Sequence, residues 1–141
     1  MKLRVLVVGK LKDPGLEALV ESYLKRSRAL LPIEFTVLRD LSGLRSRTQS
    51  SAFKVVLDER GEQVDTMQLS TWLKIWREQG ARQIDFLIGD AHGFTPEDRH
   101  QATRVLALSK LTLPHRIAQV MLVEQLYRVG TILSGHPYHH R

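Results

Sequence analysis

Apolar residues along the chain follow the two periodicities of an α/β protein. Almost entirely apolar runs, as in strands buried on both faces, predict strands at 3–8, 53–57, 84–88 and 108–113. Alternating apolar residues predict a further strand at 33–38. Apolar residues three or four positions apart predict helices over about 14–31, 66–79, 96–107 and 114–134. Strands that alternate with helices, without repeats or linkers, predict one α/β domain at 1–141 with a mostly parallel sheet.

Residues typical of helix ends and turns support these boundaries. Asp13 and Thr95 each stand before a proline, a combination that predicts a capped helix start, and Thr66 is expected to cap the helix that follows it. Residues 40–51 are rich in Ser, Thr, Arg and Gly without periodicity, which predicts a mobile basic loop. Residues 58–61 are expected to turn away from the end of the third strand.

Aromatic and aliphatic residues on two of the helices indicate how the helices pack. Trp72 and Trp76 share one face with Leu69 and Leu73, so we expect them in the core rather than on a surface that stacks on bases. The helix over 114–134 has an apolar face too wide for one side of a small sheet. We therefore expect it to be covered by the sheet and by a second subunit, which predicts a homodimer.

Composition narrows the functional classes. The chain has 21 Lys and Arg against 15 Asp and Glu, a net charge of +6, which suits either a nucleic-acid partner or an ordinary basic surface. The absence of cysteine excludes disulfides and thiolate metal sites. No apolar run approaches the ~20 residues of a membrane span, and the first run is too short for a signal peptide. A soluble cytoplasmic protein is expected.

Two turns at strand ends, about twenty residues apart, form the candidate ligand site. Gly89 and Gly93 flank the first turn. Glycine is used there either because the turn needs a positive φ or because the backbone approaches a ligand closely. The second turn lies near Pro114. Neither the dinucleotide-binding glycine motif nor the P-loop motif occurs in the chain.

The carboxyl-terminal residues are the second group that could carry chemistry. Three histidines stand at 136, 139 and 140, but no second cluster at metal-ligand spacing accompanies them, so no metal site is predicted. The tail is either a frayed end or an ordered segment that contacts RNA. Glu124 and Arg128, four residues apart, form either a surface ion pair or part of an interface or site.

Several motifs, in order along nearly the whole chain, resemble those of the RlmH-type methyltransferases, small members of the SPOUT superfamily. These motifs are Val8 to Lys12, Leu57-Asp58-x-x-Gly61, Leu87-Ile88-Gly89 with Gly93, Leu108 to His115, Glu124 to Arg128, and His136-Pro137-Tyr138-His139. The blocks ending at His115 and at His139 are specific when they occur together.

The resemblance implies a fold and an activity. The fold would be a SPOUT-type α/β/α sandwich with a trefoil knot in the carboxyl-terminal half, about 84–135. The activity would be transfer of the methyl group of S-adenosylmethionine to N3 of a pseudouridine. That nucleotide would lie in a hairpin loop of 23S ribosomal RNA in the assembled ribosome, and the enzyme would be a homodimer.

The resemblance also implies roles for particular residues. The cofactor contacts carried over from the family are Leu57, Gly89, Asp90, Ser109, Lys110, Leu111, Thr112, Leu113 and Pro114. Tyr138 and His139 are candidate bases, with Arg128 stabilising the imide anion, and in the family the tail is thought to complete the site across the dimer interface. The expected RNA contacts are Lys10, Lys12, His136, His140 and Arg141.

Two departures from the family pattern leave other functions open. Asp90 stands where the family usually has a second glycine, and it adds a negative charge near the cationic sulfonium or the RNA. Residues 41–51 are too few for the helix that the family commonly has there, which predicts an open and mobile flank. The alternatives are a ribosome-binding dimer that has lost catalysis and a knotted methyltransferase with another RNA acceptor, such as tRNA.

Overall fold

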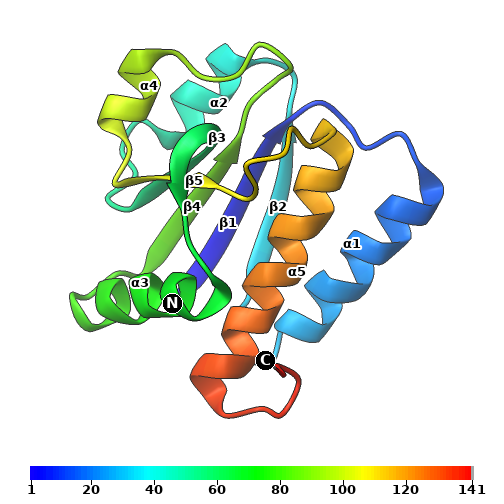
Figure 1. Cartoon of the computed structure of the whole chain (residues 1–141), viewed down its shortest axis with the longest axis vertical. Helices are drawn as coiled ribbons and strands as arrows, with labels where there is room; N and C mark the ends of the chain where they lie inside the picture. Colours follow the sequence, from blue (N-terminus) through cyan, green and yellow to red (C-terminus); the bar gives the residue numbers. More distant parts are fainter. Residues whose placement is uncertain (141) are drawn as a thin grey trace.

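A parallel sheet forms the middle of the molecule, with helices on both faces (Figure 1). The computed structural model describes residues 1–140. Within them the sheet has five strands in the order β2-β1-β4-β3-β5, and every neighbouring pair is parallel. The strands are Lys2–Val8 (β1), Ile33–Leu38 (β2), Lys54–Gln63 (β3), Gln83–Ile88 (β4) and Arg104–Ala107 (β5).

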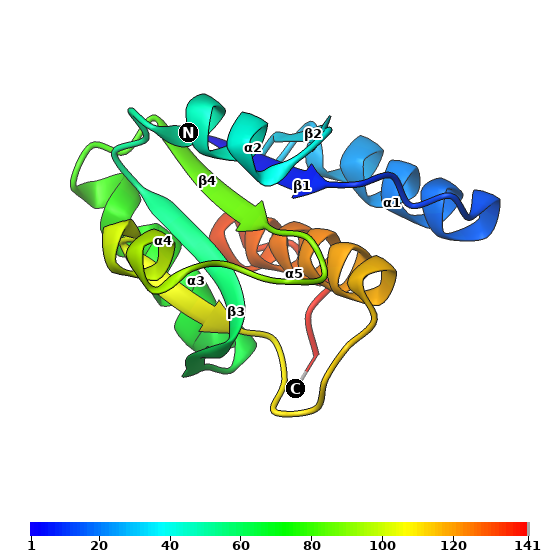
Figure 2. The ribbon, with the colours of Figure 1, turned by 90° about the horizontal axis from the view of Figure 1, so that it is seen from above.

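Five helices in residues 1–140 complete three layers. They are Pro14–Ser27 (α1), Leu41–Thr48 (α2), Thr66–Glu78 (α3), Pro96–Gln101 (α4) and His115–Ser134 (α5). Helices α1, α3 and α5 cover one face of the sheet, and α2 and α4 lie on the other (Figure 2). The predicted α/β/α sandwich with a parallel sheet is confirmed.

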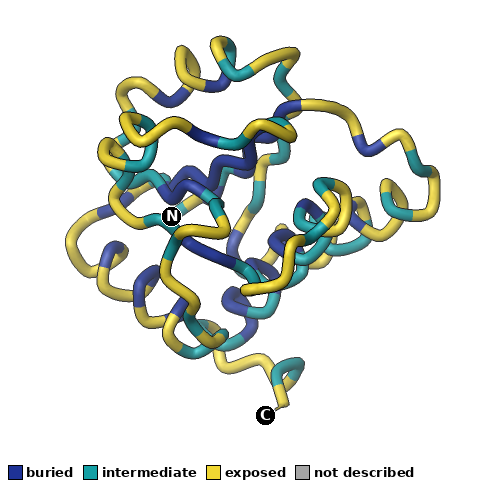
Figure 3. The backbone as a smooth tube through the Cα atoms, turned by 45° about the horizontal axis from the view of Figure 1, so that its top comes forward, coloured by how far each residue is buried: buried dark blue, intermediate teal, exposed yellow. Residues whose placement is uncertain are grey.

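Alternation along the buried strands separates two hydrophobic cores. On β1, Leu3 and Val5 point into the larger core beneath α1, α3 and α5, whereas Leu6 points into the smaller core beneath α2 and α4. Figure 3 shows how continuous the burial of these central strands is. Trp72 and Trp76 are 9% and 7% exposed in the larger core, which confirms the packing role predicted for them.

The prediction of a mobile loop at 40–51, too short for a helix, is wrong. Asp40 accepts a hydrogen bond from the Gly43 N–H at 2.8 Å and begins helix α2. Leu44 is fully buried in the smaller core, while the arginines of the helix are exposed. Only Leu44 and the partly buried Leu41 attach the helix to this core, and two apolar residues are too few to show a periodicity.

Strand β3 also extends beyond its predicted end at Leu57. Residues 58–61 continue the strand rather than turning away, with a register shift between Leu57 and Glu62 where β3 pairs with β5. A side-chain carbon on Gly61 would lie 2.6 Å from the carbonyl carbon of Val105. Glycine therefore permits the close approach of the two strands.

Two further boundaries differ from the prediction. Helix α4 ends at Gln101, and β5 occupies 104–107, so the strand expected at 108–113 is a loop. The reason is that β5 takes its hydrogen-bonding partners from β3 and leaves the next apolar residues to form the wall of a cavity. Helix α3 is capped by Asp65, which accepts the Gln68 N–H at 2.8 Å, rather than by Thr66.

Candidate active site

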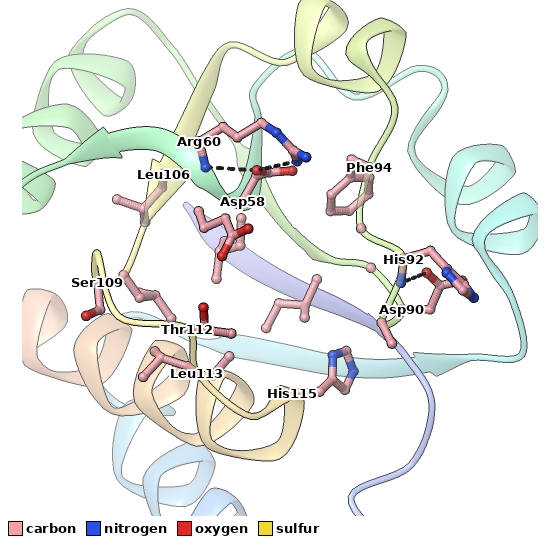
Figure 4. Close-up of a pocket in the computed structure, with 18 of the residues that line it drawn as sticks. Asp58, Arg60, Asp90, His92, Phe94, Leu106, Ser109, Thr112, Leu113 and His115 are labelled. Carbon is pink, nitrogen blue, oxygen red and sulfur yellow. Dashed lines mark hydrogen bonds and ion pairs between the residues drawn. The ribbon is translucent and has the colours of Figure 1, made fainter.

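A cavity of about 530 Å³ opens at the carboxyl ends of β3, β4 and β5 (Figure 4). This is the edge at which parallel sheets bind ligands. Its walls come from residues 57–60 within β3, from the loop that follows β4, and from the loop between β5 and α5. Of the residues predicted to contact a cofactor, the cavity is lined by Leu57, Gly89, Asp90, Ser109, Leu111, Thr112 and Leu113. Lys110 and Pro114 are not among its lining residues.

The two glycines after β4 serve different purposes. Gly93 has a φ of 72°, a conformation that side chains rarely adopt, so it makes the turn possible. Gly89 has no positive φ, but a side-chain carbon there would lie 3.3 Å from the ring of Phe94. The Phe94 ring is 6% exposed and packs over Gly89 to form part of the cavity wall.

Asp90 closes the same turn with its own side chain. Its carboxylate accepts the His92 N–H at 2.9 Å, and its carbonyl oxygen accepts the Gly93 N–H at 3.0 Å. Among residues 1–140 the non-glycine residue with a positive φ is Lys12, so Asp90 keeps an ordinary backbone conformation. The replacement of the family glycine therefore leaves the turn intact and adds a carboxylate to the cavity lining.

The loop from 108 to 114 forms the opposite wall. The Ser109 hydroxyl accepts the Leu111 N–H at 2.9 Å, and the Leu111 side chain is 76% exposed. At the end of the loop, His115 Nε2 donates to the Val8 carbonyl oxygen at 2.8 Å. This bond fastens the start of α5 to the end of β1, so the backbone of the loop is held at both ends.

A carboxylate on β3, Asp58, is the polar group that sequence reasoning did not place at the site. Its side chain is 4% exposed and lies 3.3 Å from Arg60 and 3.6 Å from Arg99. Figure 4 shows Asp58 and Arg60 across the cavity from Thr112 and Leu113. The Leu57-Asp58-x-x-Gly61 motif contained the signal, but Asp58 was expected in a solvated turn rather than in a strand.

The three candidate catalytic residues come together at the other end of α5. Glu124 Oε1 accepts hydrogen bonds from Arg128 Nη2 at 2.5 Å and from the Tyr138 hydroxyl at 3.1 Å. Arg128 Nη1 donates to His139 Nδ1 at 3.2 Å, and its guanidinium lies 4.8 Å from the centre of the Tyr138 ring. Glu124 and Arg128 are thus more than a surface pair, since together they hold the tail.

Electrostatics in this cluster favours one protonation state. The hydrogen bond to Glu124 raises the pKa of Arg128. Burial, reinforced by Tyr23 and the Glu124 carboxylate, raises the pKa of Tyr138 to about 12. Because Arg128 donates to Nδ1 of His139, the neutral ring carries its proton on Nε2. Arg128 and Tyr138 therefore keep their protons, and His139 Nε2 is buried without a hydrogen-bond partner among residues 1–140.

Within one chain the cavity and the tail cluster do not meet. His115 lines the cavity at the start of α5, and Arg128 lies thirteen residues further along, about 20 Å at the rise of an α-helix. Figure 1 shows the described part of the tail, in red, near the far end of α5.

The predicted RNA contacts divide between these two regions. Exposed Lys10 and Lys12 follow β1, near the start of α5, whereas exposed His136 and His140 belong to the tail. Arg141 lies outside the described residues. Among residues 1–140, no group of three or more His, Cys, Asp or Glu side chains is arranged to hold a metal ion, and none of the helices is long and apolar enough to cross a membrane.

The three-layer fold and the cavity between two loops define the class of protein. A family model described as "Predicted SPOUT methyltransferase" matches residues 1–139, and the chain belongs to this family. The predicted resemblance is confirmed by close relatives.

The chain is 44% identical to the Ribosomal RNA large subunit methyltransferase H of Koribacter versatilis, an alignment that covers 99% of this chain and 98% of the relative. It is 38% identical to the protein of the same name from Geobacter metallireducens, with 99% of each chain covered. Among solved structures, a probable methylase family protein from Haemophilus influenzae Rd KW20 matches with a TM-score of 0.63 at 8% identity, over 99% of this chain and 70% of that chain. This last match is a likeness of fold.

Proposed function

We propose that this chain transfers the methyl group of S-adenosylmethionine to N3 of a pseudouridine in a hairpin loop of 23S ribosomal RNA. The observation that carries the proposal is the cavity between the loops after β4 and β5, in a chain whose relatives bear the name of a ribosomal RNA methyltransferase. The acceptor would be presented by the assembled ribosome in the cytoplasm.

The residues of the cavity fit this cofactor. Its volume, about 530 Å³, lies in the range of pockets that enclose a nucleoside-sized ligand. Leu57, Leu106 and Leu113 supply apolar surface for a flat base, and the backbone groups of the two loops can bind its edge. Asp90 contributes an acidic residue to a cavity that would receive a cationic sulfonium, whereas the Asp58 carboxylate is balanced by Arg60 and Arg99.

When bound, the cofactor supplies an electrophilic methyl group. The work left to the protein is to align the acceptor and to stabilise the imide after it loses its proton. Arg128, oriented by Glu124, suits stabilisation of that anion. Tyr138, with its raised pKa, keeps its proton and orients Glu124 and Arg128.

The separation of cavity and tail supports a homodimer in which the tail of one subunit serves the cavity of the other. The same arrangement would cover the outer side of α5, where Ile117 is 38% exposed. We further infer that residues of about 84–135 form the family's trefoil knot, with the two cavity loops as its crossing segments.

One observation bears on the alternative of a ribosome-binding dimer without catalysis. Asp90 departs from the family pattern at a cofactor-contact position, as an inactivating substitution would. Its carboxylate nevertheless restores the turn through the His92 N–H, which favours an active site that still binds cofactor.

The test combines RNA mass spectrometry with calorimetry. In a strain that lacks the protein, the loop pseudouridine should lose one methyl group, and the intact gene should restore it. If the nucleotide stays methylated, the acceptor is wrong, and a tRNA survey would follow. Titration with S-adenosylmethionine separates the enzyme from the inactive dimer, because absence of binding at millimolar ligand would exclude the enzyme.

A further inference from the structure

Helices α2 and α4 are joined by a two-pronged ion pair. Arg45 Nε donates to one oxygen of the Asp98 carboxylate at 2.8 Å, and Arg45 Nη2 donates to the other, also at 2.8 Å. Such a fork fixes the relative orientation of both side chains, which a single contact between charges does not. The Asp98 side chain is 12% exposed, although that of Arg45 is 47% exposed.

Asp98 also sets the start of α4. Its carboxylate accepts the Thr95 N–H at 3.0 Å and the Thr95 hydroxyl at 2.9 Å, while the Thr95 hydroxyl accepts the Asp98 N–H. The hydrogen bonds from Arg45 and Thr95 hold the pKa of Asp98 well below its usual range. A six-residue helix has little stability of its own, so these contacts determine where it begins.

The residue before this helix start is Phe94, which forms a wall of the candidate cofactor site. Its ring also borders a second cavity of about 220 Å³, which Arg45 and Asp98 line on the side of α2 and α4. From α4, Arg99 donates to the Phe94 carbonyl oxygen at 2.8 Å. The Phe94 ring, which separates the two cavities, is therefore attached to α4 through its own backbone.

We propose that Arg45 and Asp98 are positioning residues for the cofactor: their ion pair holds α4, and through it Phe94 and the 89–94 loop, in the shape that binds the methyl donor. The inference rests on the proposed function. It assigns a role to α2, a helix that contributes no residue to the cofactor cavity.

The experiment measures cofactor binding in a double-mutant cycle. Arg45→Ala, Asp98→Asn and the double variant are titrated with S-adenosylmethionine, and their turnover is measured at saturating cofactor on ribosomes that lack the modification. Each single variant should bind the cofactor about fivefold more weakly, with kcat within about twofold of the wild type. The double variant should be no weaker than the singles, because the pair acts as a unit.

A matched control separates positioning from general destabilisation. Lys2→Ala removes another exposed ion pair, between Lys2 and Glu34. Lys2 lies at the amino end of β1, whereas the cavity lies at the carboxyl end of the sheet. This variant should leave cofactor affinity unchanged, as should any variant that merely lowers Tm. Arg45→Lys keeps the charge but loses the fork, and it should bind with intermediate affinity.

The outcomes distinguish this inference from the function on which it rests. If the wild type does not bind the cofactor, the proposed function fails. If the wild type binds and the single variants match it, or if the two single effects simply add, the positioning role is overturned. A fall in kcat without a change in affinity would also overturn it.

Discussion

The two ends of α5 carry two groups of candidate functional residues that are built differently. At the amino end, the cavity is shaped mainly by backbone and by small or apolar residues, such as Gly89, Gly93 and Leu113. At the carboxyl end, Glu124, Arg128 and the tail are held together by charged hydrogen bonds and aromatic contacts. The first group encloses the cavity, whereas no residue of the second group lines it.

This difference indicates which part of the site one chain can complete alone. The cavity has walls from three segments of the same chain, which supports our proposal that one chain binds the cofactor. None of the residues of the tail cluster lines this cavity. On the proposed function, cofactor binding and stabilisation of the acceptor are therefore separable, and a second subunit would bring them together.

The largest expected effect comes from mixing two inactive variants. Gly89→Leu drives a side chain into Phe94 and the cavity, and Arg128→Ala removes the cation of the tail. Each should lower turnover by at least about a hundredfold. After the two are co-refolded, random pairing should restore about a quarter of the wild-type turnover, because half of the dimers then contain one intact shared site.

The same mixture of variants can contradict the proposal that the cavity of one subunit works with the tail of the other. If cavity and tail of one chain worked together, every site in the mixed dimer would lack one half, and turnover would stay at the level of the single variants. Circular dichroism and Tm of each variant alone show that both are folded. Arg128→Lys, which keeps the charge but loses the fork with Glu124, should retain intermediate turnover.

The next largest effect is expected from a substitution that disturbs the cavity end of the molecule and leaves the tail cluster unchanged. Gly61→Ala places a carbon against the Val105 backbone, 2.6 Å away, where no side-chain movement can relieve the contact. The free energy of unfolding should fall by about 1–3 kcal/mol. Because β3 and β5 carry Leu57 and Leu106 into the cavity, cofactor affinity should fall as well.

A second glycine provides the control for this variant. Gly15 lies near the start of α1, and an added carbon would meet only the Asp13 carboxylate, at 3.4 Å. Gly15→Ala should be neutral or should stabilise the fold by about 0.4–1 kcal/mol, because alanine restricts the unfolded chain. Urea unfolding measures both variants, and equal stability of the two would show that the β3–β5 contact tolerates a side chain.

The cavity end was also the part that the sequence predicted better. Strands β1 and β4 are buried on both faces and form almost entirely apolar runs, and the glycines located the loop after β4, whereas the segment before His115 was predicted as a strand and is a loop. Helix α2 was not predicted because Leu44 is its one fully buried apolar residue. A single buried residue gives no helical periodicity in the sequence. The boundary between α4 and β5 was predicted wrongly because the apolar run from 105 to 108 is compatible with a helix or with a strand.

Other features depend on contacts between distant residues. Asp58 belongs to the cavity because β3 pairs with β5 beyond Leu57; the motif that starts at Leu57 marks this segment but does not reveal the pairing. Likewise, the bond from Arg128 to His139 decides which ring nitrogen carries the proton. The family resemblance named these residues as candidates but contained no information on which ring nitrogen of His139 carries the proton.

A smaller effect should come from Tyr138→Phe, which tests what holds the tail. Losing the hydrogen bond to Glu124 should lower the free energy of unfolding by about 1 kcal/mol at neutral pH. Since folding raises the pKa of Tyr138 to about 12, the tyrosine stabilises the fold below an unfolded pKa near 10, and this contribution is lost between about pH 10 and pH 12. Unfolding measured at pH 9 and pH 11 should show the two proteins converging at the higher pH. A constant difference would mean that the tyrosine is not buried against Glu124.

The smallest expected effect comes from substitutions of Asp90. They distinguish the negative charge of its side chain from the hydrogen bond by which that side chain stabilises the turn. Asparagine can still accept the His92 N–H, so Asp90→Asn keeps the turn and removes the negative charge, whereas Asp90→Gly removes both. If the carboxylate attracts the sulfonium, Asp90→Asn should bind S-adenosylmethionine about threefold more weakly and should bind the uncharged product, S-adenosylhomocysteine, as the wild type does. The difference in S-adenosylmethionine affinity between the wild type and Asp90→Asn should become smaller in 0.5 M salt, because salt screens the charge. If both ligands weaken equally in Asp90→Gly and neither changes in Asp90→Asn, the side chain serves the turn alone, and the cavity end would owe its affinity to shape rather than to charge.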